Sequence, residues 1–137
     1  MNKKIKKLIK NIRINILKKT FQAQSSHIGS CFSIVELLGV LYFNKLKKKD
    51  TFILSKGHAA LALYCTLYEK KVISKVELDT YGKNNTNLMS HASHKVKGIE
   101  FSTGSLGHGL PYAVGKALGE KINKTNNNIY VLISDGE

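Results

Sequence analysis

The stretch that decides the fold is IYVLISDGE, residues 129–137. Its first five residues are apolar, and several are β-branched or aromatic, which is typical of a buried strand. Ser134, Asp135 and Gly136 follow where such a strand delivers its carboxyl end. Open α/β sheets bind ligands at that end of their strands. The stretch therefore predicts a ligand site. A strand of this kind needs a following helix to cover it, so we expect this chain to be the front part of a larger enzyme.

A second strand is predicted at 51–54, where the short run TFIL leads directly into SKGH at 55–58. A helical pattern follows from 59 to about 70. The glycine-rich stretch GSLGHG at 104–109 precedes another helical pattern that reaches about residue 122. Both stretches place small residues and an imidazole at the start of a helix. The alternation of helices and strands predicts an α/β fold with a parallel sheet flanked by helices, incomplete at the C-terminus.

The N-terminal segment predicts an amphipathic helix that ends near Thr20. Its apolar residues recur at helical spacing with lysines between them: Ile5, Leu8, Ile9, Ile12, Ile16 and Leu17. Residues 21–30 are polar and contain glycine, so we expect a loop there, and His27 lies in it.

Two S-x-x-E capping boxes predict further helix starts. Ser33 and Glu36 would open a helix that runs to about Phe43, and Ser74 with Glu77 would open a short one. The Asn-rich segment that follows, residues 82–90, is expected to be irregular.

The composition limits the class of protein. With 137 residues and 42% hydrophobic content, the chain has apolar material for one modest domain. The two cysteines, Cys31 and Cys65, lie in apolar surroundings without C-x-x-C spacing, which favours buried, reduced thiols over a disulfide or a zinc site. No run approaches the roughly 18 apolar residues of a membrane-spanning helix, and no signal peptide is recognisable. We therefore expect a cytoplasmic protein without a membrane span.

The net charge of +13 is the one compositional feature that favours a different function, binding to polyanions. Eight of the 22 basic residues lie between positions 3 and 19, and residues 45–49 hold a second cluster. Against this, Arg13 is the only arginine, and no aromatic residues interleave with the lysines. Asparagine is equally abundant, so a general Lys/Asn/Ile bias also explains the charge. A basic polyanion-binding module remains the alternative from another functional class, and no specific nucleic acid is expected.

The stretch 102–109 offers exposed backbone N–H groups and suits a phosphate. A glycine-rich turn for tight helix packing is equally compatible with it. Asp135 is a hard oxygen ligand suited to Mg²⁺, which takes one or two carboxylates together with phosphate oxygens. Asp followed by Gly is also a common turn, so a helix N-cap is the alternative reading of Asp135.

Four of the five histidines fall in predicted loops or helix starts: His27, His58, His91 and His108. Neutral imidazoles there can accept, donate and transfer protons near neutral pH. A solvated loop histidine is the alternative for each. His94 is interpreted as a surface residue. His91 and His94 are three positions apart, but no third ligand lies near them in the sequence, so no zinc site is expected.

The separate segments resemble one family, the N-terminal pyrophosphate-binding domain of transketolases. The order and approximate spacing agree from about Ile12 to Glu137, and we assign residues 1–137 to this domain. The matching segments are 26–29 (SHIG), 55–59 (SKGHA), His91 with 98–100 (GIE), 103–107 (TGSLG) and 135–136 (DG).

This resemblance implies a thiamine diphosphate enzyme that transfers a two-carbon ketol unit from a ketose to an aldose. It assigns proton transfer and substrate binding to His27, and contacts with substrate hydroxyls to His91. Asp135 would bind the Mg²⁺ that bridges the diphosphate. The cofactor contacts that it implies come from His58, Gly104, Ser105, Leu106, Asp135 and Gly136.

The sequence departs from the family pattern at three positions. Ser134 replaces a glycine, His108 a common glutamine, and Ile28 a frequent proline. In the family, the asparagine that completes the metal site and the pyrimidine-binding domain, whose glutamate activates the cofactor, would come after Glu137. We therefore expect this chain alone to bind the cofactor weakly and to have no catalytic activity. The expected partner is a C-terminal transketolase subunit or domain. The complete enzyme is expected to be dimeric and to act on a sugar or sugar phosphate. The nearest enzymatic alternative is a thiamine diphosphate synthase that condenses pyruvate with an aldehyde.

Overall fold

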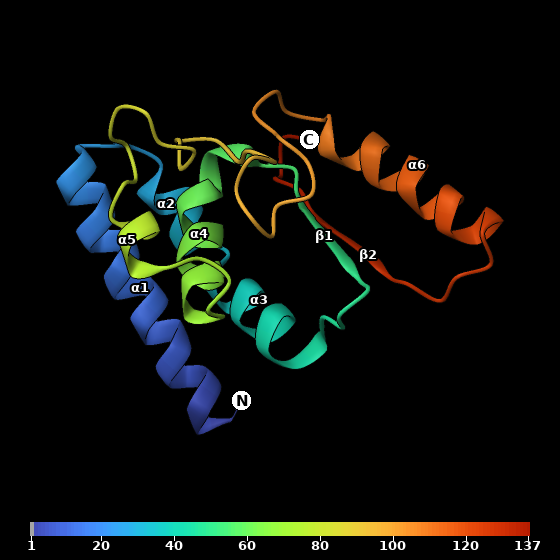
Figure 1. Ribbon diagram of the computed structural model, residues 1–137, viewed down its shortest axis with the longest axis horizontal. Helices are drawn as coiled ribbons and strands as arrows, with labels where there is room; N and C mark the ends of the chain where they lie inside the picture. Colours follow the sequence, from blue (N-terminus) through green and yellow to red (C-terminus); the bar gives the residue numbers. More distant parts are fainter. Residues whose placement is uncertain (1) are drawn as a thin grey trace.

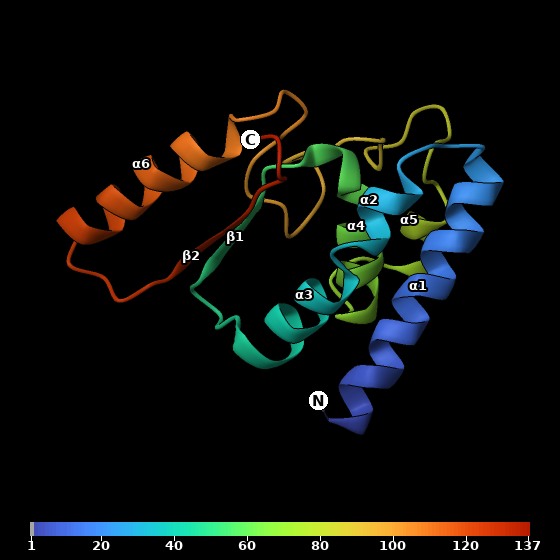
Figure 2. The ribbon, with the colours of Figure 1, turned by 180° about the vertical axis from the view of Figure 1, so that it is seen from behind.

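Two parallel strands separate a helical layer from a single outer helix in the computed structural model, which describes residues 2–137 (Figure 1). The outer helix is α6 (Gly109–Ile122), and it packs on both strands. The other elements are α1 (Lys3–Ala23), α2 (Ile28–Phe32), α3 (Val35–Val40) with a π-helical turn at Leu41–Lys45, β1 (Thr51–Leu54), a 3-10 turn at Gly57–Ala59, α4 (Ala60–Glu69), α5 (Lys75–Leu78) and β2 (Ile129–Leu132). The reverse view shows the same layers (Figure 2).

The sheet confirms the predicted parallel α/β arrangement. β1 pairs with β2 in parallel register, from Thr51 opposite Ile129 to Leu54 opposite Leu132. The Ser55 N–H donates to the Leu132 carbonyl at 2.8 Å and extends the pairing by one residue. Because the two strands run the same way, the segments that follow them lie at one edge of the sheet. This edge is the carboxyl edge, where ligands are expected.

The core of the helical layer is α4, in which every residue from Ala60 to Leu67 is buried. It packs against α1, whose residues Ile9, Ile12 and Ile16 are buried, and against α3. A helix that is apolar on all sides requires neighbours on all sides, and α1, α3 and α5 supply them.

Both cysteines are buried and free, as predicted. Burial raises the pKa of the Cys31 thiol and that of the Cys65 thiol. The thiolate is the reactive form, so both side chains act as small apolar groups of the core.

Two of the predicted local features at the N-terminus were wrong. α1 continues to Ala23 and ends where Gln24 adopts a left-handed conformation with φ 47°. The predicted loop at 21–30 is therefore shorter, and α2 already begins at Ile28. His27 still lies in the short connection between α1 and α2.

The Ser33–Glu36 capping box does not form. The Ser33 hydroxyl donates to the Ser30 carbonyl at 2.9 Å, and Ile34 occupies the N-cap position without a side-chain bond. The Glu36 carboxylate accepts two hydrogen bonds from Arg13, at 2.6 and 2.8 Å, and so joins α3 to α1. The second box is confirmed, because the Ser74 hydroxyl accepts a hydrogen bond from the Glu77 N–H at 3.0 Å.

One 18-residue stretch among residues 2–137, Ile28–Lys45, is apolar enough by length and composition to cross a membrane, with a mean hydropathy of 1.2. In the fold it comprises α2, a turn at residues 33–34, α3 and the π-helical turn. Its buried side chains include Cys31, Val35 and Leu38, which belong to the core formed with α1 and α4. We interpret its apolar residues as core residues.

Candidate active site

Three of the predicted histidines meet at the carboxyl edge of the sheet. The ring centroids of His27 and His58 are 5.4 Å apart, and those of His27 and His91 are 6.0 Å apart. They come from the α1–α2 connection, the turn after β1 and the loop before α6. His58 is half-buried, whereas His27 and His91 are exposed. We call these three residues the histidine cluster.

Local backbone geometry positions two members of the cluster. His27 has φ 68°, the left-handed conformation, and immediately precedes α2. Its Nδ1 lies 3.3 Å from the Ser26 hydroxyl. The carbonyl of His91 accepts a hydrogen bond from the Tyr64 hydroxyl of α4 at 2.9 Å, which ties the exposed loop to the buried helix.

His58 is positioned by the close approach of two backbone segments. A Cβ added at Gly57 would lie 2.4 Å from the Thr103 carbonyl oxygen, so only glycine fits there. The Gly57 carbonyl accepts from the Ala92 N–H at 3.2 Å, and the Ala92 carbonyl accepts from the Thr103 N–H at 3.0 Å. The Thr103 hydroxyl donates to the Leu54 carbonyl at 2.6 Å. These bonds hold the turn with His58 against the loops of His91 and Gly104.

The surroundings of His58 favour its neutral form. Burial lowers its pKa, and the positive charges of His27, Lys56 and His91 lower it further. A neutral imidazole can accept a proton or a hydrogen bond at one ring nitrogen while it donates at the other.

Glu137 joins three segments of the carboxyl edge. Its Oε1 accepts from the Ser55 hydroxyl at 2.6 Å and from the Gly107 N–H at 2.8 Å. Its Oε2 accepts from the Ser134 N–H at 2.7 Å. Burial opposes ionisation, but these hydrogen bonds outweigh it and lower the pKa of Glu137. Nothing local in the sequence relates Glu137 to Ser55, so this role was missed before the fold was known.

The residues predicted to contact the cofactor in the glycine stretch are open to solvent. Gly104, Ser105 and Leu106 are exposed and lie in the loop before α6 rather than in its first turn. A Cβ at Gly104 would meet the His91 ring at 3.5 Å, so the loop lies beside the histidine cluster. Gly107 has φ 84° and open space around it.

Tight packing, the alternative reading of the glycine stretch, applies to Gly109. A Cβ there would lie 2.5 Å from the Ser55 side chain. The start of α6 therefore packs directly on the end of β1. His108 occupies the N-cap position of α6, is exposed and makes no side-chain capping bond. His94 lies outside the cluster and is exposed, with its Nδ1 2.7 Å from the Ser102 hydroxyl.

Asp135 and Gly136 form an exposed turn after β2, at the same edge. A Cβ at Gly136 would meet nothing within 4 Å, so the backbone of this turn is accessible. Within residues 2–137, no three His, Cys, Asp or Glu side chains lie close enough to hold a metal by themselves. One exposed carboxylate beside open backbone fits a Mg²⁺ ion that arrives with a diphosphate, which would supply further oxygen ligands.

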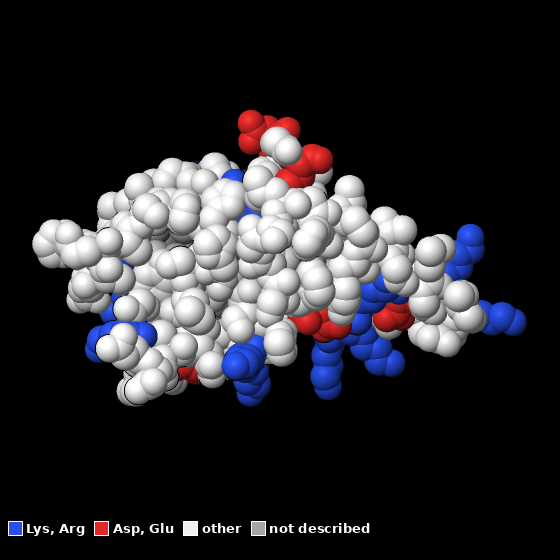
Figure 3. Space-filling view, turned by 90° about the horizontal axis from the view of Figure 1, so that it is seen from above, with Lys and Arg blue, Asp and Glu red and all other residues white. Residues whose placement is uncertain are grey.

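Seen from the carboxyl edge, the surface is mainly uncharged, and the lysine and arginine side chains visible on this face lie mostly toward its margins (Figure 3). This face therefore lacks the continuous basic surface that nonspecific polyanion binding uses. Open α/β sheets bind ligands at this edge, and the imidazoles, the open glycine loop and the acidic turn presented there suit a phosphorylated ligand.

Comparison with known proteins identifies the family. Residues 4–137 match the family described as transketolase, thiamine diphosphate binding domain, and the chain belongs to it.

Two relatives are named as transketolase subunits. One is a subunit of the apulose-4-phosphate transketolase of Phocaeicola vulgatus, which is 39% identical over 91% of this chain and 48% of its own length. The other is the 6-deoxy-6-sulfo-D-fructose transketolase subunit SqwG of a Clostridium species, which is 40% identical over 81% of this chain and 44% of its own length. The chain thus spans about half the length of these relatives.

A solved structure confirms the fold. Transketolase from Leishmania mexicana superposes with a TM-score of 0.87 and 24% identity, over 96% of this chain and 23% of that protein. The α/β architecture is therefore that of the first part of a transketolase.

Proposed function

We propose that this chain is part of the thiamine diphosphate-binding subunit of a two-subunit transketolase, which transfers a two-carbon ketol unit from a ketose to an aldose. The observation that carries the proposal is the convergence of three imidazoles beside an open glycine loop and an acidic turn. Family membership and the relatives named as single subunits of a transketolase support it. The substrates would be sugars or sugar phosphates.

In this proposal, three segments would hold the cofactor. The accessible backbone at 104–106 and at Gly136, together with the His58 ring, lines it, and Asp135 binds the Mg²⁺ that neutralises the diphosphate. When bound, thiamine diphosphate supplies the carbanion chemistry of ketol transfer, and the protein supplies orientation and polarisation.

The histidine cluster handles protons and substrate hydroxyls. His27 and His91 are exposed and face the same space, so their ring nitrogens can reach a sugar above the loop. His27 would transfer the proton of the reacting hydroxyl, and His91 would bind a neighbouring hydroxyl. His58, whose pKa is lowered, stays neutral near pH 7 and can accept a hydrogen bond without adding charge.

A partner is required in this proposal. Relatives named as one subunit of a transketolase imply a second, complementary subunit. We propose that a C-terminal transketolase subunit of this kind completes the site in a dimer of such pairs.

The test is reconstitution with that C-terminal subunit. The pair formed by the full-length subunit that contains these residues should transfer ketol units from a ketose phosphate to an aldose phosphate in the presence of thiamine diphosphate and Mg²⁺, and that subunit alone should not. Condensation of pyruvate with an aldehyde instead would identify a synthase. Binding that depends steeply on salt and ignores the cofactor would favour a polyanion-binding module.

Two variants test the assigned residues. Asp135→Asn should weaken Mg²⁺-dependent cofactor binding by the pair at least tenfold in calorimetric titration. His94→Ala is the matched control, because His94 is an exposed histidine outside the cluster, and it should bind as the native pair does. Tight binding that survives Asp135→Asn would refute the metal assignment.

A further inference from the structure

The outer face of α1 exposes lysines and apolar side chains along one line. Residues 3, 7, 10, 14, 17 and 21 follow the alternating spacing of four and three that places side chains on one side of a helix. The first three are lysines, and the last three are Ile14, Leu17 and Phe21, which are 38%, 49% and 77% exposed. We call this line the outer stripe of α1.

The outer stripe faces away from the rest of the described structure. The opposite side of α1, which carries Ile9, Ile12 and Ile16, packs into the core. In both ribbon views α1 lies along the edge of the molecule (Figures 1 and 2). A flat partner surface can therefore meet α1 along its whole length, which is about 30 Å for its 21 residues.

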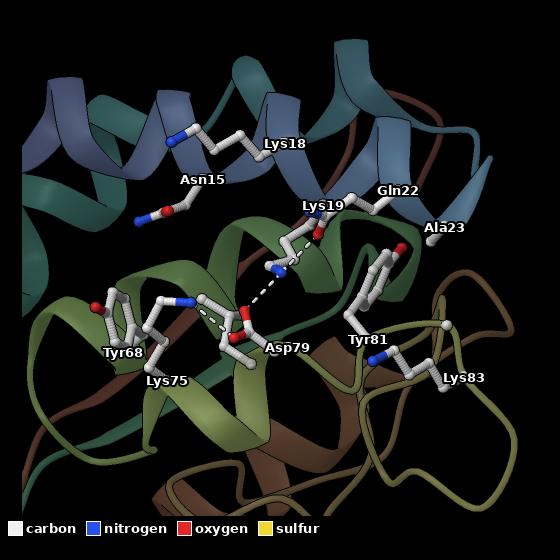
Figure 4. Close-up of a pocket in the computed structure, with 12 residues that line it drawn as sticks. Asn15, Lys18, Lys19, Gln22, Ala23, Tyr68, Lys75, Asp79, Tyr81 and Lys83 are labelled. Carbon is white, nitrogen blue, oxygen red and sulfur yellow. Dashed lines mark hydrogen bonds and ion pairs between the residues drawn. The ribbon is translucent and has the colours of Figure 1, made fainter.

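Most cations of α1 have no ion-pair partner. The helix contains no Asp or Glu, and within residues 2–137 only Arg13 and Lys19 pair with a carboxylate. In the pocket between α1 and α5, Lys19 turns toward Asp79, whereas Lys18 points away from that pair (Figure 4). The remaining lysines of α1 are all exposed and unpaired within the same residues: Lys3, Lys4, Lys6, Lys7, Lys10 and Lys18.

These lysines do not stabilise the helix that carries them. Lys3 and Lys4 lie in the first turn of α1, where the partial positive charge of the helix N-terminus disfavours cations. Lys3 repels Lys7, and Lys6 repels Lys10, because side chains four positions apart are neighbours on a helix. An anionic surface would relieve both costs, whereas a neutral one would not. The face of α1 is therefore complementary in charge to an anionic partner that also accepts apolar side chains.

The distribution of charge favours a lipid surface over a protein helix. A second copy of α1 would oppose lysines to lysines in parallel pairing, and lysines to the apolar half of the stripe in antiparallel pairing. A helix from another protein would cover a narrow seam, but the unpaired lysines extend from Lys6 on one flank of the stripe to Lys4 on the other. A bilayer meets such a broad face at once, because lysine stems reach the head groups while apolar side chains enter below them.

We propose that the outer face of α1 binds an anionic lipid bilayer reversibly, as a peripheral contact. The lysines of the first turns would lie against the phosphate head groups, and the three apolar side chains of the stripe would enter the boundary with the acyl chains. This contact uses no residue of the histidine cluster, the glycine loop or the acidic turn. It does not depend on the proposed transketolase activity.

The test uses the full-length subunit that contains these residues. It is sedimented with vesicles of phosphatidylglycerol and phosphatidylcholine in equal amounts, and with vesicles of phosphatidylcholine alone. We expect the subunit to sediment with the anionic vesicles only, and added salt to weaken the binding. Equal recovery with both kinds of vesicle, or none with either, would overturn the proposal. Binding to soluble polyglutamate as tight as to anionic vesicles would also overturn it, because that result would indicate an acidic protein partner.

A double variant tests the contribution of the lysines. Lys7→Gln/Lys10→Gln should lower the affinity for the anionic vesicles by roughly tenfold or more. The matched control is Lys121→Gln/Lys124→Gln, which removes the same charge from exposed positions at the far end of α6, on the other side of the molecule (Figure 1). The control should bind as the native subunit does. Equal losses in both double variants would identify general attraction to a basic protein and overturn the proposal.

A fluorescent variant tests whether the apolar half of the stripe enters the bilayer. The 137 residues contain no tryptophan, so the difference from the native subunit reports the introduced indole. The fluorescence of Phe21→Trp should be quenched by phospholipids brominated in the acyl chains. Ile122→Trp, at a position 79% exposed at the end of α6, is the control and should not be quenched. Equal quenching in both variants, or vesicle binding without quenching of Phe21→Trp, would overturn the proposal.

Discussion

Replacing Gly57 by alanine tests the packing that positions His58. The added Cβ would lie 2.4 Å from the carbonyl oxygen of Thr103 and 2.6 Å from its carbonyl carbon. Both atoms belong to the backbone, so no rotamer change relieves the overlap. The two segments must separate by at least about 0.6 Å to reach even a tight contact of 3.0 Å. Overpacking of this kind costs about 1–3 kcal/mol.

We expect Gly57→Ala to lose about 2 kcal/mol or more of the free energy of unfolding, since the hydrogen bond from the Ala92 N–H to the Gly57 carbonyl is also strained. Urea titration followed by circular dichroism measures the loss. The matched control is Gly115→Ala, because nothing lies within 4 Å of a Cβ there and the residue is exposed in α6. That change should leave stability unchanged or raise it by about 0.5–1 kcal/mol. Equal midpoints for Gly57→Ala and the native chain would refute the reasoning.

Three further predictions concern a helix cap and two titrating side chains. Ser74→Ala should cost about 1 kcal/mol through loss of the N-cap bond of α5, whereas Ser105→Ala, at an exposed loop position, should change stability by less than about 0.5 kcal/mol in the same urea titration. Asp79 has a folded pKa of about 2, below its unfolded value of about 3.9, so its stabilisation is present above that value and lost as the pH falls toward 2. The difference in unfolding free energy between the native chain and Asp79→Asn should therefore be about 1 kcal/mol at neutral pH, because Asp79 is 38% exposed, and should shrink on acidification. The His58 ring should titrate in NMR below 6.5, with its stabilising contribution complete above that pH and lost as the pH falls through the folded pKa. His27→Gln should move the midpoint only part of the way back, because burial is the larger cause, and a native midpoint at or above 6.5 would contradict this account.

Periodic and short-range signals predicted most of the elements. The lysine-interrupted apolar spacing of α1, the runs TFIL and IYVL and the Ser74 cap all depend on residues close together in the sequence. The parallel sheet followed from their order, because strands separated by helices pair in parallel. These signals therefore predicted which elements exist, with errors at their ends.

The errors came from competition between partners that the sequence does not reveal. Ser33 has the right neighbour for a capping box, but its hydroxyl bonds to the preceding turn, and Glu36 pairs with Arg13, 23 positions away. Helix α1 extends past Thr20 because Gln24, in a left-handed conformation, supplies the C-cap only at that point. Local sequence patterns do not show which hydrogen-bond partner or helix end is adopted, because tertiary contacts decide between them.

The sequence predicted individual residues of the candidate site but not their arrangement in space. The sequence named His27, His58 and His91 individually, and the fold brings the ring centroids of His58 and His91 to 5.4 and 6.0 Å from that of His27. The function of Gly57 depends on a carbonyl 46 positions away at Thr103, and that of Glu137 on Ser55, 82 positions away. Contacts of this kind need the fold before they can be seen.

The pairing of β1 with β2 also determines the order in which the chain can fold. Everything from Ser55 to Asn128 lies between the two strands, so their pairing closes a long loop and has a high entropic cost. The contacts among α1, α3 and α4 span shorter stretches of sequence and need no sheet. We expect the helical layer to form first and β2 to join last, as in other folds where distant contacts limit the rate. The histidine cluster would then gather early, and the acidic turn would reach it only in the final step.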